Sequence, residues 1–478
     1  MDISGLLQKY GGRLPKPLRD MIYPAIFGLA LSPAGGALVI TTNVAERLRG
    51  PHALRPPPAS LTTEDLNAVS YESIDMLNAI SREATHRGYA VIGGSGYVGT
   101  YIVKLLLRRG ETSVRILDVA TPSRQLLDNP AVTFIPCDIT SRQSVEEGLT
   151  TPFASTGAPP AVIFHCAASI RFWERAGYTW PASHRVNVQG TENVLAAARQ
   201  LPNETLLIYT SSSDVILPRP RFLHIAGELD SKPYDSVVFS DNDPPLPEYA
   251  ESATSYVRSK VIGERLVLEA NGDSLRTLSL RPGQTVVGPA DRFLTSTLTM
   301  PTVPVWDAEW AHTNVCVWDV AAAHLCAEKA LVERGGEVGG EAFLITGSGP
   351  AWKMQDTRNA LQHYSKKTLV FKFIPPLLIW VLAHFVEAFL FLRYYFLLPV
   401  FALFGSRPSI TPKWAGELIY LQPSTLEYMR DVVIDDSRAR DRLGYCPQWT
   451  TEQAIRYTVD QVESGAVGGT HGLQLKEL

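Results

Sequence analysis

Residues 89–110 read YAVIGGSGYVGTYIVKLLLRRG and place four glycines within seven positions. The apolar run before them predicts a short buried strand, and the stretch after them predicts a helix that ends at Gly110. We expect Gly93 to allow a sharp turn, Gly96 to let a pyrophosphate approach the main chain, and Gly99 to let helix and strand pack closely. The free N–H groups at the start of the helix favour an anion. The segment therefore predicts a dinucleotide-binding turn.

The strands that follow strengthen this interpretation. "SVRILD" ends in Asp118, nineteen residues beyond Gly99, where a carboxylate accepts hydrogen bonds from an adenosine ribose and repels a 2′-phosphate. NAD is therefore favoured over NADP, although Asp118 also suits an ordinary turn at a strand end. "VTFIPCDIT" predicts a third strand ending in Asp138, near the adenine, and "AVIFHCAAS" and "TLLIYTSSS" predict two more. Strands alternating with helices predict an α/β Rossmann fold with a doubly wound parallel sheet.

A candidate for proton transfer follows the fifth strand. "SYVRSK" places Tyr256 four residues before Lys260, which on a helix puts both side chains on one face. The ordinary pKa of tyrosine, about 10, is too high for a base at neutral pH. A nearby ammonium group, helped by an oxidised nicotinamide ring, is expected to lower that pKa. A serine at the strand end is expected to hold the substrate oxygen by a hydrogen bond.

These motifs, together with "HCAAS", "VNVQGTENVL", "LRPGQTVVGP" and "RLGYCPQWTTEQAI", resemble the extended short-chain dehydrogenase/reductases. Within them the chain is similar to the 3β-hydroxysteroid dehydrogenase group, which includes decarboxylating sterol-4α-carboxylate 3-dehydrogenases. The resemblance runs from about Tyr89 to Gly465. It implies that Tyr256 is the general base, Lys260 its modulator and a ligand of the nicotinamide ribose, and Ser212 the donor to the substrate oxygen. Ser211 competes with Ser212 for that role.

The resemblance also implies further cofactor-binding residues. Asn187 resembles the residue that kinks a helix and supports the lysine through water, although a helix cap or surface amide is its ordinary role. Pro282 and Gly283 resemble the lining of the nicotinamide pocket. The other expected cofactor contacts lie in the glycine turn and at the ends of the third and fourth strands: Tyr97, Val98, Asp138, Ile139 and Ala167. No metal site is expected, and His165 is interpreted as a packing residue.

Composition sets the limits on these interpretations. The net charge of −4 shows no basic stripe and argues against a nucleic-acid partner. Five scattered cysteines indicate reduced thiols in a cytosol-facing protein. The length predicts several units: a hydrophobic membrane segment in residues 1–50, a linker and amphipathic helix in 51–87, an NAD-binding domain in 88–290 and a smaller C-terminal substrate-binding part in 291–478. The amphipathic helix is expected from Thr62 to Arg87.

Two apolar stretches suggest contact with a membrane. Met21–Val44 carries no charge and is long enough to cross a bilayer, with a buried apolar hairpin as the alternative. Leu369–Phe404 is rich in aromatic residues but contains His384 and Glu387. An amphipathic helix in the headgroup layer therefore fits it better than a simple span, with a core helix of the second domain as the alternative.

The expected reaction is NAD-dependent oxidation of a 3β-hydroxyl group on a sterol-like or terpenoid ring, followed by decarboxylation where a carboxylate stands on the neighbouring carbon. The rivals are an NAD(P)H-dependent ketoreductase of a secondary-metabolite pathway and a dinucleotide-sensing module without catalysis. The expected partners are an apolar ring alcohol and a membrane surface, and the resemblance allows a homodimer. The expected location is the endoplasmic reticulum membrane, with the catalytic domain facing the cytosol.

Overall fold

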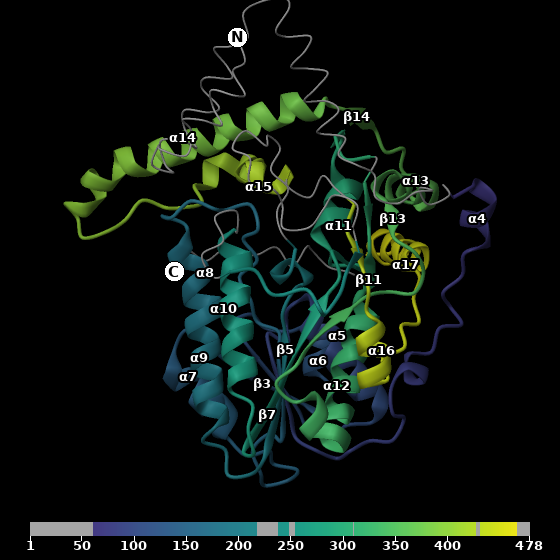
Figure 1. The fold of residues 1–478 in the computed structure, drawn as a ribbon, viewed down its shortest axis with the longest axis vertical. Coiled ribbons are helices and arrows are strands. Elements are labelled where there is room, and N and C mark those ends of the chain that lie inside the picture. The colour runs from purple at the N-terminus through teal and green to yellow at the C-terminus, as the bar shows by residue number, and fades with distance from the viewer. Residues whose placement is uncertain (1–60, 218–237, 248–253, 309, 427–430, 466–478) are drawn as a thin grey trace, which may run out of the picture.

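The computed structural model describes residues 61–217, 238–247, 254–308, 310–426 and 431–465 (Figure 1). The predicted membrane segment Met21–Val44 and the linker before Thr62 lie outside the described residues.

A parallel sheet of seven strands forms the centre of the molecule, in the order β12-β7-β5-β4-β1-β2-β3. The strands are β1 (Tyr89–Ile92), β2 (Val114–Asp118), β3 (Val132–Pro136), β4 (Val162–His165), β5 (Thr205–Thr210), β7 (Leu275–Pro282) and β12 (Ala342–Ile345). The direction of winding reverses between β1 and β4, which is where such sheets open a crevice for a ligand. The predicted doubly wound sheet is confirmed. The third strand ends at Pro136, so Asp138 follows it rather than ending it.

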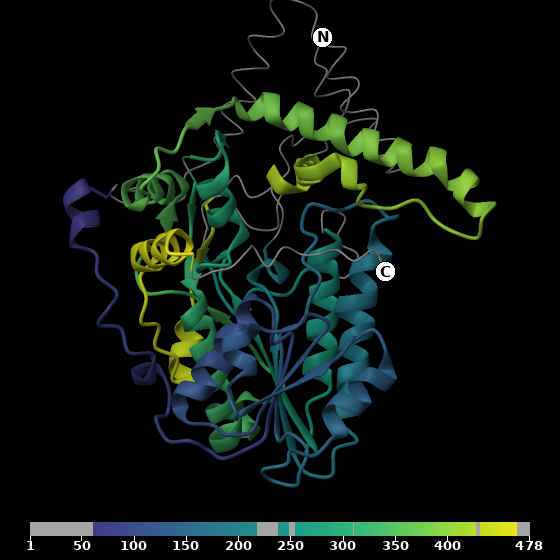
Figure 2. The ribbon, with the colours of Figure 1, turned by 180° about the vertical axis from the view of Figure 1, so that it is seen from behind.

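Helices cover both faces of the sheet (Figures 1 and 2). One face carries α5 (Tyr97–Arg109), α12 (Val317–Val338) and α16 (Ser437–Leu443), and the other carries α7 (Arg142–Thr150), α9 (Gly190–Ala198) and α10 (Ser255–Glu269). The central strands read as continuous apolar runs because both of their faces are buried. Since the strands are fixed from both sides, their carboxyl ends form a rigid edge.

The predicted helix from Thr62 to Arg87 is wrong over most of its length. The helix α4 spans only Thr63–Ala68, although Thr62 is its N-cap as expected and forms a capping box with Asp65. After it the chain runs irregularly apart from one 3-10 turn, η2 (Met76–Ala79). The cause is tertiary packing: the Trp449 indole N–H lies 3.1 Å from the sulfur of Met76, and the ring of Tyr71 stacks on Trp449. The segment is therefore a strap shaped by residues near the C-terminus.

Short ladders and helices build up the region beyond the carboxyl edge of the sheet. The ladders pair β8 (Thr285–Val287) with β11 (Asn314–Cys316), β10 (Ala311–His312) with β13 (Trp352–Lys353), β9 (Val303–Val305) with β14 (Phe371–Phe373), and β6 (Val238–Phe239) with β15 (Val433–Ile434). The helices are α11 (Arg292–Thr299), α13 (Met354–Tyr364), α15 (Pro423–Leu426) and α17 (Thr451–Glu463), with the 3-10 segment η5 (Lys413–Tyr420). Because β12 follows residue 290, the main sheet takes its last strand from the predicted substrate-binding part.

The helix α14 (Pro376–Ala402) lies across the carboxyl side of the sheet, above α15 (Figures 1 and 2). It continues through Pro399 into its last turn. Among the described residues it is the one helix long and apolar enough to cross a membrane, and only 11% of an apolar stretch of 18 residues within it is buried. The alternative of a core helix is therefore wrong. The exposed face of α14 carries apolar side chains such as Phe385 and Phe396, and the expected position in the headgroup layer of a membrane remains a prediction.

Candidate functional site

The glycine turn connects β1 to α5 at the centre of the carboxyl edge. Gly93 has φ +81°, and a Cβ atom there would lie 2.6 Å from the backbone nitrogen of Ala167, which follows β4. A Cβ atom at Gly99 would overlap the carbonyl oxygen of Gly93. Gly96 is the N-cap of α5. Because glycine has no side chain that could accept hydrogen bonds from the helix, the first turn of α5 offers its N–H groups to an anion. This cradle fits a dinucleotide pyrophosphate.

Tyr97 and Val98 form the first turn of α5, and they lie against the apolar core. The hydroxyl group of Tyr97 donates to the carbonyl oxygen of Val286 at 3.1 Å, and the ring would block any side chain at Gly288. Tyr97 therefore links the glycine turn to β8. Its contact with a cofactor remains a prediction.

Asp118 ends β2 beside the glycine turn. Its carboxylate accepts hydrogen bonds from the backbone N–H of Ser95 at 3.0 Å and of Ala120 at 2.9 Å. The carboxylate is therefore held at the mouth of the cradle, at the place expected for the adenosine ribose. This position favours NAD, because the negative charge repels the 2′-phosphate of NADP.

The remaining predicted cofactor contacts lie along the same edge. The carboxylate of Asp138 accepts from the N–H and the hydroxyl group of Thr140. The side chain of Ile139 is buried against Gly190, and its carbonyl oxygen accepts from the side-chain amide of Asn193 at 2.9 Å. Pro282 ends β7, two strands away from β4 in the sheet. The structure thus brings the predicted nucleotide residues to one edge, while their individual roles remain predictions.

The candidate catalytic residues lie on α10 and after β5. Lys260 is only 2% exposed, and its ammonium group donates to the carbonyl oxygen of Thr210 at 2.6 Å and to the hydroxyl group of Tyr209 at 3.3 Å. Burial lowers the pKa of Lys260 to about 8. Ser212 lies close enough to Tyr256 to lower its pKa, and its hydroxyl oxygen accepts from the N–H of Asp214 at 3.2 Å, whereas the hydroxyl group of Ser211 is buried without a partner among the described residues. The geometry therefore favours Ser212 over Ser211.

The lowering of the Tyr256 pKa that is expected from Lys260 together with an oxidised nicotinamide ring remains a prediction. Burial raises the pKa of Tyr256 above its ordinary value, the Asp214 carboxylate raises it further, and the nearby Ser212 hydroxyl group lowers it. The ammonium group of Lys260 donates to Thr210 and Tyr209 rather than to the phenol. The phenol is thus a protonated group at neutral pH. It needs an additional positive charge, such as an oxidised nicotinamide, to become a base.

Asn187 supports the same helix from the side. It lies in a π-helical turn, η3 (Arg185–Gln189), between α8 (Trp180–His184) and α9, in agreement with the expected kink. Its amide nitrogen donates to Ser259 at 2.8 Å, and its amide oxygen accepts from the N–H of Ser169. Asn187 therefore contacts the neighbour of Lys260 rather than Lys260 itself. His165 is fully buried and bonds to Thr191, as a packing residue does.

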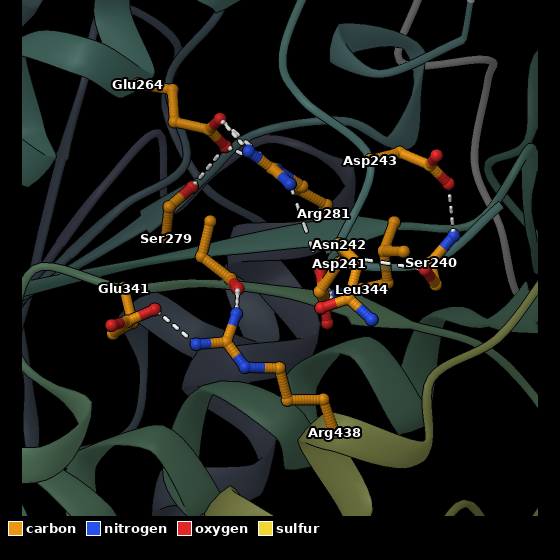
Figure 3. Close-up of polar contacts among 11 residues, drawn as sticks. Ser240, Asp241, Asn242, Asp243, Glu264, Ser279, Arg281, Glu341, Leu344 and Arg438 are labelled. Atoms are coloured by element: carbon orange, nitrogen blue, oxygen red, sulfur yellow. Dashed lines mark hydrogen bonds and ion pairs between the residues drawn. The ribbon is translucent and has the colours of Figure 1, made fainter.

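A buried charge network that sequence reasoning missed fixes α10 to the sheet (Figure 3). Glu264 accepts hydrogen bonds from Arg281 on β7 at 2.6 Å and from Ser279 at 2.8 Å, and Asp241 lies 3.8 Å from Arg281. The carboxylate of Asp241 also accepts from the N–H of Leu344 on β12. The spacing offered a signal, because Glu264 follows Lys260 by four residues and so lies on the same face of α10.

A doubly wound sheet with this glycine turn, and with a buried tyrosine–lysine pair on the helix beside its carboxyl edge, defines an NAD-dependent oxidoreductase that acts on CH–OH groups. A model of the 3-beta hydroxysteroid dehydrogenase/isomerase family matches residues 90–367. The chain belongs to this family, and the resemblance inferred from the sequence motifs is confirmed.

Individual relatives agree with this assignment. The chain is 29% identical over 402 residues to 3beta-hydroxysteroid-dehydrogenase/decarboxylase isoform 2 of Arabidopsis thaliana, an alignment that covers 79% of this chain but 62% of that protein. It is 25% identical over 393 residues to the decarboxylating sterol-4-alpha-carboxylate 3-dehydrogenase of Candida albicans, covering 77% of this chain and 96% of that protein. It is 29% identical over 296 residues to human 3 beta-hydroxysteroid dehydrogenase type 7, covering 58% and 73%.

Solved structures share the fold. MoeE5 in complex with UDP-glucuronic acid and NAD aligns with a TM-score of 0.54 and 18% identity over 79% of this chain and 99% of that protein. The UDP-glucose 4-epimerase of Thermotoga maritima aligns with a TM-score of 0.54 and 16% identity over 80% of this chain and 100% of that protein.

Proposed function

We propose that this protein oxidises the 3β-hydroxyl group of a sterol-like ring with NAD, and that carbon dioxide leaves when a carboxylate stands on C4. The observation that carries the proposal is the buried pair of Tyr256 and Lys260, one helical turn apart on α10, with Ser212 close to the phenol. The names of the relatives from Arabidopsis and Candida support the substrate class.

The chemistry follows from the residues at the edge of the sheet. Ser212 donates a hydrogen bond to the substrate oxygen, and Tyr256, once ionised, removes the hydroxyl proton. NAD, when bound, accepts the hydride from the same carbon. Lys260 supplies a fixed positive charge behind the pair, because its ammonium group is held by Thr210 and Tyr209. In a 4-carboxylated substrate the new ketone accepts the electrons of the breaking C–C bond, and the resulting enolate takes up a proton.

The Tyr256→Phe variant tests the mechanism. NADH formation and carbon dioxide release are measured on 3β-hydroxysterols with and without a 4-carboxylate. We expect the variant to lose about 100-fold or more in rate, as is typical when a general base is removed. Undiminished oxidation would exclude Tyr256 as the base. Equal turnover of both sterols by the wild type, without carbon dioxide, would exclude decarboxylation, and reduction of ketones alone would favour the ketoreductase.

A membrane surface is part of this proposal. The relatives' names indicate an apolar substrate, and α14 carries an exposed apolar face on the same side of the molecule as the carboxyl edge of the sheet. Location at the endoplasmic reticulum, with the catalytic domain facing the cytosol, remains a prediction. Fractionation of cells that express the tagged protein tests this location, and recovery only in the soluble fraction would contradict it.

A further inference from the structure

The outer face of α14 is a continuous apolar stripe. Its members recur every three or four residues, as one face of a helix requires, and each is about half exposed or more: Leu378, Leu382, Phe385, Phe389, Leu392 and Phe396. At 1.5 Å per residue the stripe is about 27 Å long. An exposed apolar surface of this length marks a contact with lipid or with another protein.

The inner face of α14 is attached to the protein body. Ile379, Ala383, Leu390 and Tyr394 are buried there. Two charged side chains of the helix also contact the protein body. Glu387 bonds to Arg175 through both carboxylate oxygens at 2.7 Å, and Arg393 donates to the carbonyl oxygen of Ser409. A transmembrane orientation would break these contacts and place two charges in hydrocarbon, which is unfavourable. The attachment therefore favours a helix that lies along a surface.

Charge at the two ends of α14 identifies that surface as lipid. Exposed cationic side chains precede the helix at Lys367 and Lys372 and follow it at Arg407 and Lys413. Apolar stripes flanked by cations bind at the interface of membranes that contain anionic lipids, with the stripe in the acyl region and the cations among the headgroups. A second copy of the same chain would place these like charges near one another.

Residues 171–179, which we term the bridge, connect α14 with the catalytic helix. On the α14 side, Arg175 bonds to Glu387, and the ring of Tyr178 stacks on Tyr394 with 4.3 Å between the centroids. On the α10 side, the carbonyl oxygen of Glu174 accepts from the N–H of Ser255 at 2.7 Å.

The bridge is internally rigid and ends next to the catalytic tyrosine. Arg171 and Glu174 form a buried ion pair within it. The Thr179 hydroxyl group bonds to the hydroxyl group of Ser255 at 3.2 Å, and Ser255 directly precedes Tyr256. A movement of α14 therefore reaches the first turn of α10 through a short, hydrogen-bonded segment.

We infer that the outer stripe of α14 lies in the surface of an anionic membrane, parallel to it, and that the bridge transmits this attachment to Tyr256, so that lipid activates the enzyme. The second part rests on the proposed oxidation. Without lipid, α14 exposes its stripe to water and is held mainly through Glu387 and its buried inner side chains. With lipid, its position is fixed, and the bridge fixes the start of α10.

The first test measures attachment alone. Sedimentation with phosphatidylcholine vesicles that contain phosphatidylserine compares the wild type with a stripe variant, Phe385→Ser/Phe389→Ser/Phe396→Ser. We expect the wild type to sediment with the vesicles and the stripe variant to stay in solution with unchanged thermal unfolding. Vesicle binding by the stripe variant, or a dimer of the wild type in solution that covers the stripe and does not bind vesicles, would overturn the inference.

The second test measures coupling with a water-soluble 3β-hydroxysteroid, so that delivery from the membrane does not limit the rate. Addition of vesicles is expected to raise kcat of the wild type about fivefold, which is at the lower end of coupling between sites. Arg175→Gln is expected to bind vesicles but to lose this increase. Arg142→Gln, which breaks an exposed ion pair within α7, is the matched control and should respond like the wild type. An equal response of Arg175→Gln and the wild type would overturn the coupling.

A third readout separates this inference from the proposed reaction. Amide hydrogen exchange of residues 171–179 and of the first turn of α10 is expected to slow when vesicles bind the wild type, but not Arg175→Gln. This holds whatever the enzyme oxidises. Absence of NADH formation with every ring alcohol would therefore refute the reaction, whereas unchanged exchange at the bridge would refute the coupling.

Discussion

Replacement of Lys260 with methionine is expected to make the protein more stable and inactive. The structure buries the ammonium group at 2% exposure, and burial lowers its pKa from 10.5 to about 8. At neutral pH this corresponds to about 3 kcal/mol of unfavourable free energy in the folded state. In the variant the carbonyl oxygen of Thr210 loses its hydrogen-bond donor, and this loss reduces the stabilisation by about 1 kcal/mol. We therefore expect a gain of about 2 kcal/mol in the free energy of unfolding at pH 7.

The pH dependence makes the prediction specific. Because the pKa of Lys260 is lower in the folded than in the unfolded protein, the unfolded state holds more protons between pH 8 and pH 10.5. Between pH 8 and pH 10.5 the free energy of unfolding of the wild type therefore rises by about 3 kcal/mol relative to that of the variant. The methionine variant should be the more stable protein at pH 7 and the less stable one above pH 10.

Urea unfolding at pH 7 and pH 10, followed by circular dichroism, measures both quantities. Lys329→Met is the control, since it removes an exposed lysine that lies near Glu333. NADH formation is measured on the same samples and should be lost in Lys260→Met only. A variant that is less stable than the wild type at pH 7, or a difference that does not change with pH, would refute the reasoning.

Three further predictions concern the cofactor site and its support. Asp118→Ser should weaken NAD binding about tenfold, because a charged acceptor is lost, and should let NADP bind; titration of both dinucleotides measures this. Gly99→Ala should lose NAD binding and about 2 kcal/mol of stability, because its methyl group would overlap the carbonyl oxygen of Gly93; a thermal shift with and without NAD tests it. Glu264→Gln should lower the pKa of Lys260 further, because the Glu264 carboxylate raises it. The alkaline limb of kcat/KM should then move about one pH unit lower, and Glu264→Asp should restore it.

The parts of the fold that were predicted correctly depend on local chemistry. The turn at Gly93 has the positive φ that glycine permits, and β2 ends at Asp118 as its apolar pattern indicated. The helix after the turn ends at Gly110 in the left-handed conformation. These features repeat over a few residues, so the sequence shows them without knowledge of the rest of the chain.

The parts that were predicted wrongly depend on distant residues. The strap after α4 is not helical because Tyr71 and Met76 pack on Trp449, which lies more than 370 residues further along the chain. The surroundings of α14 could not be settled from its composition, because they depend on which face of the helix Glu387 and Tyr394 turn toward the protein body.

The sequence by itself determined the class of fold and the dinucleotide turn, and it predicted the candidate tyrosine, lysine and serine, because spacing along strands and helices carries that information. Only the tertiary structure decided the electrostatic state of these groups. Burial raises the pKa of Tyr256 and lowers that of Lys260, and the ammonium group donates to Thr210 rather than to the phenol. Desolvation depends on every element packed around a site, so the energies of the candidate site appear only when the chain is folded.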